Sequence, residues 1–172
     1  MKTLYLVRHA KSSWKDTSLD DFNRPLNGRG KRDAPFMGKL FAKKNIAVDL
    51  IISSPATRTI KTAQIIAEQI SYKTKIKTEQ KLYDAFADEI LKVIQSVDSI
   101  YNSLVIVAHN PGLTSLSNQL IKEKITDIPT CGIVAIEFNN DWKDISEDSG
   151  NFIFYEYPKS TSQNNNCGHL LF

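Results

Sequence analysis

Short, nearly continuous apolar runs alternate along this chain with longer segments in which apolar residues recur at helical spacing. The apolar runs have the length and character of strands buried on both faces, and they lie at residues 3–7, 48–52 and 104–108. The helical stripes cover residues 34–41, 56–70, 90–101 and 113–120. Strands that alternate with helices predict an α/β fold with a mostly parallel central sheet.

The last third of the chain follows a different pattern. Residues 133–138 and 152–157 are rich in β-branched and aromatic side chains, and a polar stretch rather than a helix separates them. This spacing predicts an antiparallel pair of strands on one side of the sheet. Residues 160–166 are polar and rich in asparagine. We therefore expect one domain over residues 1–159 and a polar C-terminal tail over residues 160–172.

Composition narrows the function classes without identifying one. A length of 172 residues suits a single domain, and the net charge of +3 comes without the dense Lys/Arg stripe of a nucleic-acid binder. Cys131 and Cys167 lack the spacing of zinc ligands, which indicates free thiols in a reducing compartment. The sequence shows neither a signal peptide nor a membrane span. We expect a cytoplasmic protein without nucleic-acid or membrane partners.

Each predicted parallel strand ends in residues suited to binding an anion. Arg8 and His9 follow the first strand, Arg58 comes shortly after the second, and His109 follows the run 104–108. The carboxyl ends of parallel strands meet at one edge of a sheet, where ligands gather. We therefore expect these four side chains to lie close together, although each alone would be unremarkable.

Two predicted helix starts reinforce that expectation. Ser54 before Pro55, and Asn110 before Pro111, are typical of an N-cap followed by the first helical residue. Helix amino ends at the ligand edge of the sheet favour an anion. Two arginines, two histidines and two helix amino ends point to a phosphoryl group. The two histidines lack the spacing of a metal site, and His169 lies in the polar tail, so we expect no metal there.

With these residues in view, the chain resembles the histidine phosphatase superfamily, which has the phosphoglycerate-mutase-like fold. Within that superfamily it is similar to the SixA-type phosphohistidine phosphatase branch. The resemblance covers roughly residues 1–159 and leaves the tail unmatched. Its motifs are found at residues 6–14, 21–26, 28–30, 53–59 and 108–112, with shorter likenesses at residues 82–83 and 158–159.

The resemblance implies a three-layer α/β/α fold with a mixed sheet, and catalysis without a metal or cofactor. It implies that His9 is the nucleophile that accepts the phosphoryl group. Arg8 and Arg58 would then hold the phosphoryl oxygens, and His109 would donate a further hydrogen bond to the transition state. His9 must attack as a neutral imidazole, and neighbouring arginines would lower its pKa and keep it neutral near pH 7.

Three further residues are candidates for substrate binding. Asn110 follows His109 directly. Asp21 together with Arg24 either shapes the rim of the pocket or orients Arg58, or the pair is an ordinary surface salt bridge. The residues alone do not decide between these two readings.

The proton donor is the part of the machinery that the sequence does not provide. Related mutases and sugar phosphatases use a glutamate in the region that follows the third strand of their fold. In this chain that region corresponds to residues 79–85, which contain no glutamate in a matching motif. Asp84 and Asp88 are the remaining candidates. A histidine leaving group has a pKa of about 6.5 and can depart already protonated, whereas an alcohol needs an acid. This favours a phosphoramidate substrate.

The chain is also too short for a long insertion over the site, which suits an open groove and a phosphorylated protein side chain. The preferred hypothesis is therefore a phosphatase that acts on protein phosphohistidine. The alternatives are a small-molecule phosphomonoesterase or mutase of the same fold and, less favoured, a non-catalytic phosphate-binding module. Retention of both histidines and both arginines counts against the last alternative.

Overall fold

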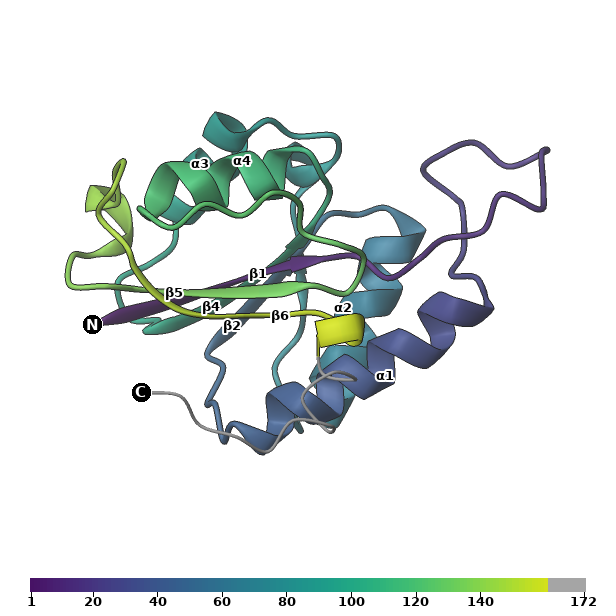
Figure 1. The fold of residues 1–172 in the computed structure, drawn as a ribbon, viewed down its shortest axis with the longest axis horizontal. Coiled ribbons are helices and arrows are strands. Elements are labelled where there is room, and N and C mark those ends of the chain that lie inside the picture. Colours follow the sequence, from purple (N-terminus) through teal and green to yellow (C-terminus); the bar gives the residue numbers. More distant parts are fainter. Residues whose placement is uncertain (161–172) are drawn as a thin grey trace.

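The computed structural model describes residues 1–160 and arranges them around a mixed six-stranded sheet (Figure 1). The strand order is β3-β2-β4-β1-β5-β6. The first four of these are parallel to one another, whereas β5 runs antiparallel to both β1 and β6. The strands are β1 (Lys2–Arg8), β2 (Leu50–Ser53), β3 (Lys77–Thr78), β4 (Ser103–Ala108), β5 (Ile133–Phe138) and β6 (Asn151–Glu156).

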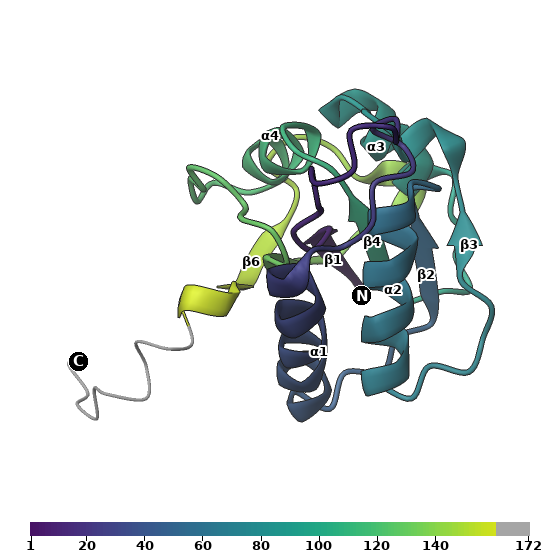
Figure 2. The same ribbon diagram turned by 90° about the vertical axis from the view of Figure 1, so that its right-hand side faces the viewer.

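Helices cover both faces of this sheet. Helices α1 and α2 pack together on one face, and α3 and α4 pack together on the other, which gives the expected three-layer α/β/α arrangement (Figures 1 and 2). The helices are α1 (Gly28–Lys43), α2 (Thr57–Gln69), α3 (Ala87–Gln95) and α4 (Gly112–Leu120), with short 3₁₀ turns η1 (Gln80–Leu82) and η2 (Trp142–Asp144). None of the helices within residues 1–160 is long and apolar enough to cross a membrane.

The two-sided burial explains why the central strands read as continuous apolar runs. Leu4 and Leu6 of β1 belong to the core beneath α3 and α4, whereas Tyr5 and Val7 belong to the core beneath α1 and α2. Strand β4 alternates in the same way. Because successive side chains point to opposite faces, a strand covered on both faces needs apolar residues at every position.

Most of the predicted elements are confirmed, with three differences. Strand β3 was not predicted, because two exposed polar residues carry no periodic signal; it forms by pairing with Ile52 and Ser53. Strand β2 begins at Leu50 rather than at residue 48. Helix α3 ends at Gln95, although Val97 and Tyr101 beyond it still pack against the same core. The predicted antiparallel pair is β5–β6, which contains a bulge next to Ala135.

The expectations for the tail fall almost wholly outside the described residues. Cys167 and His169 lie there, so only Ser160 of the predicted tail is described. Cys131 is described and is a buried free thiol, as expected, and burial raises its pKa to about 12.

The start of α1 is fitted tightly against the chain that follows His9. Asn27 caps this helix by accepting a hydrogen bond from the Gly30 amide at 2.9 Å. A Cβ atom added at Gly30 would lie 2.2 Å from the Lys11 carbonyl oxygen, so only glycine fits this approach. The packing of α1 therefore fixes the backbone that leaves β1.

We expect Gly30→Ala to destabilise the fold by about 1–3 kcal/mol, because the backbone of Lys11 must move to admit the methyl group. The midpoint of urea unfolding measures this change. Gly28→Ala is the matched control in the same helical turn, since a Cβ there meets nothing within 4 Å. Equal stability of the two variants would show that the approach of α1 to Lys11 is not tight.

Candidate functional site

The structure brings the three predicted strand ends together at one edge of the sheet. The chain runs along β1 away from the N-terminus and passes at the far end of the sheet into the long loop before α1 (Figure 1). His9 follows β1, His109 follows β4, and their ring centroids are 5.2 Å apart. Arg58, in the first turn of α2, places Nη2 3.4 Å from Nδ1 of His109. The expected grouping of these side chains is therefore present.

His9 is held in one tautomer. Its Nδ1 lies 2.7 Å from the carbonyl oxygen of Ala10, which can only accept, so Nδ1 carries the proton and donates it. The other ring nitrogen, Nε2, consequently holds the free lone pair. Burial lowers the pKa of His9 to about 4; the Ala10 carbonyl opposes this shift, and the nearby arginines reinforce it. The imidazole is therefore neutral at pH 7, mainly because it is buried and only secondarily because of the arginines.

His109 is also buried and has a partner on each ring nitrogen. Its Nε2 lies 2.7 Å from the Ser54 hydroxyl, and its Nδ1 faces Arg58. Because a guanidinium only donates, Nδ1 accepts and the proton lies on Nε2 in this arrangement. Burial lowers the pKa of His109 to about 3, with further contributions from His9 and Arg58.

Three guanidinium groups near His9 each keep one buried nitrogen without a hydrogen-bond partner in the described part of the chain. These nitrogens are Nε of Arg8, Nη1 of Arg24 and Nε of Arg58. Leaving a buried donor of a charged group unsatisfied costs free energy, so such donors normally have a partner. An anion with several oxygens, placed beside His9, would supply acceptors to all three groups. This is the strongest indication of what the site binds.

Other contacts hold Arg8 in place. Its Nη1 donates to the Ile128 carbonyl at 2.7 Å and lies 3.5 Å from a carboxylate oxygen of Asp127. The side-chain amide of Asn110 donates to the Ile128 carbonyl at 2.9 Å and to the Asp127 carboxylate at 2.8 Å. Asn110 thus fastens the loop that carries the partners of Arg8, and its amide donors face that loop.

Asp21 connects several groups of the site. Its carboxylate accepts from Arg58 at 2.9 Å and from the Tyr83 hydroxyl at 2.8 Å, and it pairs with Arg24 at 3.0 Å. Burial pushes the pKa of Asp21 up, but these hydrogen bonds and charges lower it below its ordinary value. Of the two readings left open by the sequence, the geometry favours a carboxylate that orients Arg58 over an ordinary surface salt bridge. Trp14 stacks on Arg24, whose Cζ lies 3.5 Å from the ring centroid.

The predicted helix caps are wrong in detail. Helix α2 begins at Thr57 after Ala56, so Ser54 is not its N-cap; the hydroxyl of Ser54 bonds His109 instead. Helix α4 begins at Gly112, and Pro111 occupies the cap position after a cis peptide bond from Asn110. Both prolines therefore stand before their helices rather than inside them. The Ser54 side chain is engaged by His109, whereas the Asn110 side-chain oxygen still accepts from the Thr114 amide at 3.2 Å, as a helix cap would.

The structure gives neither candidate acid a place in this cluster. Asp84 is exposed with a left-handed backbone (φ 50°), and Asp88 is exposed in the first turn of α3. Within residues 1–160, neither carboxylate contacts His9 or His109. The sequence marked Tyr83 only as a likeness to the family and gave it no role, because its contact with Asp21 spans 62 positions of the chain and leaves no local signal. The described residues contain no group of three or more His, Cys, Asp or Glu side chains suited to a metal ion.

Known proteins share both the sequence motifs and the fold. The family model of the histidine phosphatase superfamily (branch 1) matches residues 4–87. An uncharacterized chloroplastic protein of Arabidopsis thaliana is 28% identical over 159 residues, which make up 87% of this chain and 72% of that protein.

Two solved structures superpose on nearly the whole described chain. A putative phosphohistidine phosphatase SixA from Agrobacterium tumefaciens is 26% identical and has a TM-score of 0.79, covering 91% of this chain and 98% of that one. The protein histidine phosphatase SixA complexed with tungstate is 16% identical and has a TM-score of 0.80, covering 92% and 99% of the two chains. The latter likeness concerns the fold alone.

The protonation states of the two histidines can be measured. We expect His9 and His109 to stay neutral from pH 7.5 down to pH 5, because their pKa values are lowered to about 4 and about 3. Nitrogen NMR of the imidazole rings reports this and should place the proton of His9 on Nδ1. His9→Gln and His109→Gln assign the signals. A midpoint near 6.5 for either ring would contradict the burial that the structure shows.

Proposed function

This chain belongs to the histidine phosphatase superfamily, and we propose that it hydrolyses the phosphoryl group of a protein phosphohistidine through a covalent intermediate on His9. The observation that carries the proposal is the arrangement around His9: a neutral imidazole with a free Nε2 lone pair, and three guanidinium groups with unpartnered buried donors. An imidazole in this state is a nucleophile toward phosphorus, and the guanidinium donors match the oxygens of a phosphoryl group.

In the first step, Nε2 of His9 attacks phosphorus while the bond from phosphorus to the substrate nitrogen breaks. Negative charge spreads over the three equatorial oxygens in such a transfer, so catalysis consists mainly of positioning and electrostatic stabilisation. Arg8 and Arg58 are the proposed donors to those oxygens, and Arg24 adds a third positive charge. Asp21 holds Arg58 through a hydrogen bond, and Asn110 holds the loop that contacts Arg8. The contribution of Asp21 and Asn110 to substrate binding is therefore indirect.

His109 contributes through a change of tautomer. When oxygens of the phosphoryl group occupy the site, Arg58 can turn a donor toward them and leave Nδ1 of His109. The Ser54 hydroxyl can donate as well as accept, so it can donate a hydrogen bond to Nε2 of His109 once that nitrogen carries no proton. Nδ1 then carries the ring proton and donates to a phosphoryl oxygen. His109 is therefore proposed as a stabiliser of the transition state and not as the nucleophile.

In the second step, water attacks the phosphorus of the intermediate and the bond to His9 breaks. The electron pair of that bond returns to Nε2, which regenerates the neutral imidazole with its proton still on Nδ1. Both protons of the attacking water leave with inorganic phosphate, which is released as dihydrogen phosphate and ionises in solution. No step needs a metal ion, because guanidinium and imidazole donors supply the positive charge.

The leaving group distinguishes this proposal from its alternative, a small-molecule phosphomonoesterase or mutase. Asp127 lies near Arg8, and Asp21 is ionised and engaged by Arg58, Arg24 and Tyr83, so Asp21 is poorly suited to donate a proton. Asp84 and Asp88 lie outside the cluster. A phosphohistidine whose other ring nitrogen is already protonated departs as a neutral imidazole, with the electron pair of the broken bond on the leaving nitrogen, and needs no such acid, whereas an alkyl ester does.

We expect the wild-type protein to trap a phosphoryl group on His9 that is labile to acid and stable to base. His9→Ala should lose the label and reduce kcat/KM at least about 10³-fold, because the nucleophile is gone. Rapid quenching with a labelled phosphohistidine peptide measures both quantities. His169→Ala, a histidine of the predicted tail, is the matched control and should retain both. Full turnover by His9→Ala would exclude this mechanism.

We further expect a phosphohistidine peptide to be turned over at least about tenfold faster than an alkyl phosphate, because the site provides no evident acid for an alkoxide. Initial rates of phosphate release at pH 7 measure the ratio. Asp84→Asn and Asp88→Asn should leave both rates unchanged. A preference for the alkyl ester, lost in one of these two variants, would instead support a small-molecule phosphatase with that residue as its acid.

A further inference from the structure

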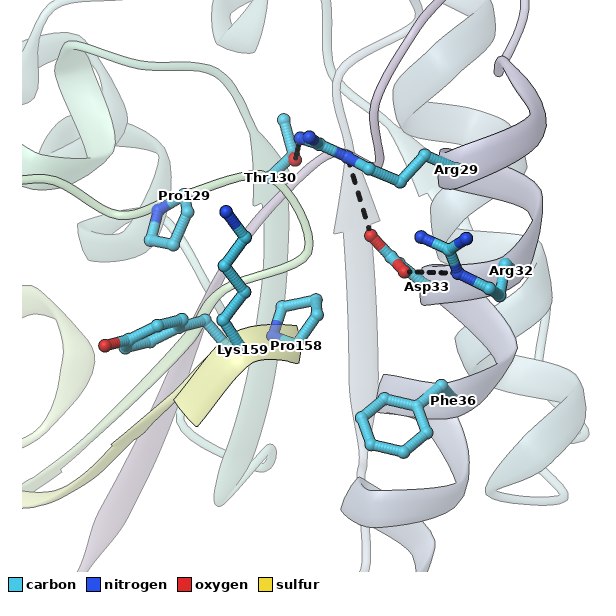
Figure 3. Close-up of a pocket in the computed structure, with 9 residues that line it drawn as sticks. Arg29, Arg32, Asp33, Phe36, Pro129, Thr130, Pro158 and Lys159 are labelled. Carbon is cyan, nitrogen blue, oxygen red and sulfur yellow. Dashed lines mark hydrogen bonds and ion pairs between the residues drawn. The ribbon is translucent and has the colours of Figure 1, made fainter. Parts of the chain in front are cut away.

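A groove of about 420 Å³ lies beside the site, between α1 and the opposite wall formed by residues 129–130 and 157–159 (Figure 3). Arg29, Arg32 and Phe36 extend into it from α1, and Thr130 and Lys159 face them. The proposed chemistry uses none of these side chains. The residues that line the groove are therefore separate from the residues of the proposed chemistry.

The groove carries an excess of positive charge. Arg29, Arg32 and Lys159 line it together with a single carboxylate, that of Asp33. Asp33 is shared between Nε of Arg29 at 3.8 Å and Nε of Arg32 at 3.3 Å. One carboxylate cannot neutralise three cations, and the side chain of Arg32 is 73% exposed. The charge of the groove therefore suits an acidic ligand.

Apolar side chains also line the groove. Phe36 is 44% exposed even though it is large and hydrophobic, and Tyr157 and Pro129 complete the apolar lining. An extended peptide could rest its backbone and apolar side chains on these residues while its carboxylates meet the cations. A free inorganic anion would use only the cationic part, so the combination favours a polypeptide.

Both walls of the groove are built on the chain that surrounds His9. Arg29 spans the groove and donates to the Thr130 hydroxyl at 3.3 Å (Figure 3). The next residue, Cys131, donates its amide to the carbonyl oxygens of Arg8 and His9 at 3.1 and 3.3 Å. On the other side, the start of α1 lies against Lys11. A ligand in the groove therefore lies alongside the segment that carries the nucleophile.

We propose that this groove binds an acidic segment of the phosphoprotein substrate, next to the phosphohistidine that His9 attacks. The inference rests on the proposed function and adds the feature by which the substrate protein is recognised. Exposed charges of this kind act mainly on the rate at which the substrate associates and on KM, and dissolved salt weakens their attraction. Recognition in the groove should therefore appear in KM and should weaken as the salt concentration rises.

The test uses two peptides that differ only beside one central histidine, with glutamates on both sides in the first and glutamines in the second. Fluorescence anisotropy of the unphosphorylated peptides measures binding to the full chain, independently of any reaction. Peptides phosphorylated on the histidine with phosphoramidate then give kcat and KM. The wild-type protein should bind the acidic peptide more tightly and show the lower KM for it, with a similar kcat for both.

Reversing the exposed charges of the groove provides the decisive variant. Arg32→Glu combined with Lys159→Glu should raise the KM for the acidic peptide about tenfold, since two attractions become repulsions. Turnover of a small aryl phosphate should stay unchanged, which also shows that the variant is folded. Lys31→Glu is the matched control, because it is exposed on the same helix but does not line the groove.

Each outcome decides the matter. Equal binding of both peptides by the wild-type protein, or an equal effect of Lys31→Glu, would overturn the docking proposal. Tight binding of the acidic peptide only after removal of residues 161–172 would assign the groove to the chain itself and also overturn it. If the acidic peptide binds in the groove but its phosphohistidine is not hydrolysed, the docking surface stands and the proposed function fails.

Discussion

The site depends on holding three guanidinium groups close to one neutral imidazole without neutralising them fully. Asp21 pairs with Arg24 and Arg58, and Asp127 lies near Arg8, so two carboxylates face three cations. The charges of all three arginines act on His9, and each guanidinium keeps one buried donor without a partner among the described residues. Burial keeps the histidines neutral, and this charge reinforces that effect while favouring an anion at the same place. A nucleophile and a binding site for its target thus arise from one electrostatic arrangement.

The fold supplies the rigidity that this arrangement needs. Strands β1 and β4 are neighbours at the centre of the sheet and are buried on both faces, so the residues that follow them start from fixed positions. Asn110 and the loop of residues 127–132 secure Arg8 from one side. The close approach of Gly30 to Lys11 fixes the chain beyond His9 from the other side. The three cations remain close together despite their mutual repulsion, because the packed backbone determines where they lie.

The sequence predicted the elements and the main cluster because these follow from local patterns. Burial on both faces makes the central strands apolar throughout, and parallel strands bring Arg8, His9 and His109 to one edge. The contact of Tyr83 with Asp21 and that of Ser54 with His109 join distant parts of the chain, and a local pattern does not encode them. Ser54 was predicted as a helix cap for this reason. The groove lined by Arg29 and Lys159 was also missed, because it forms only when α1 lies opposite residues 129–130 and 157–159, which are distant in the sequence.

The central claim is that a phosphoryl group binds between Nε2 of His9 and the unpartnered arginine donors. A crystal structure with vanadate, which adopts the geometry of a phosphoryl group in transfer, tests it most directly. The account predicts vanadium bonded to Nε2 of His9, with its oxygens within hydrogen-bond distance of Nε of Arg8, Nε of Arg58 and Nδ1 of His109. Vanadate bound elsewhere, or held beside His9 with those arginine nitrogens still unpartnered, would contradict it.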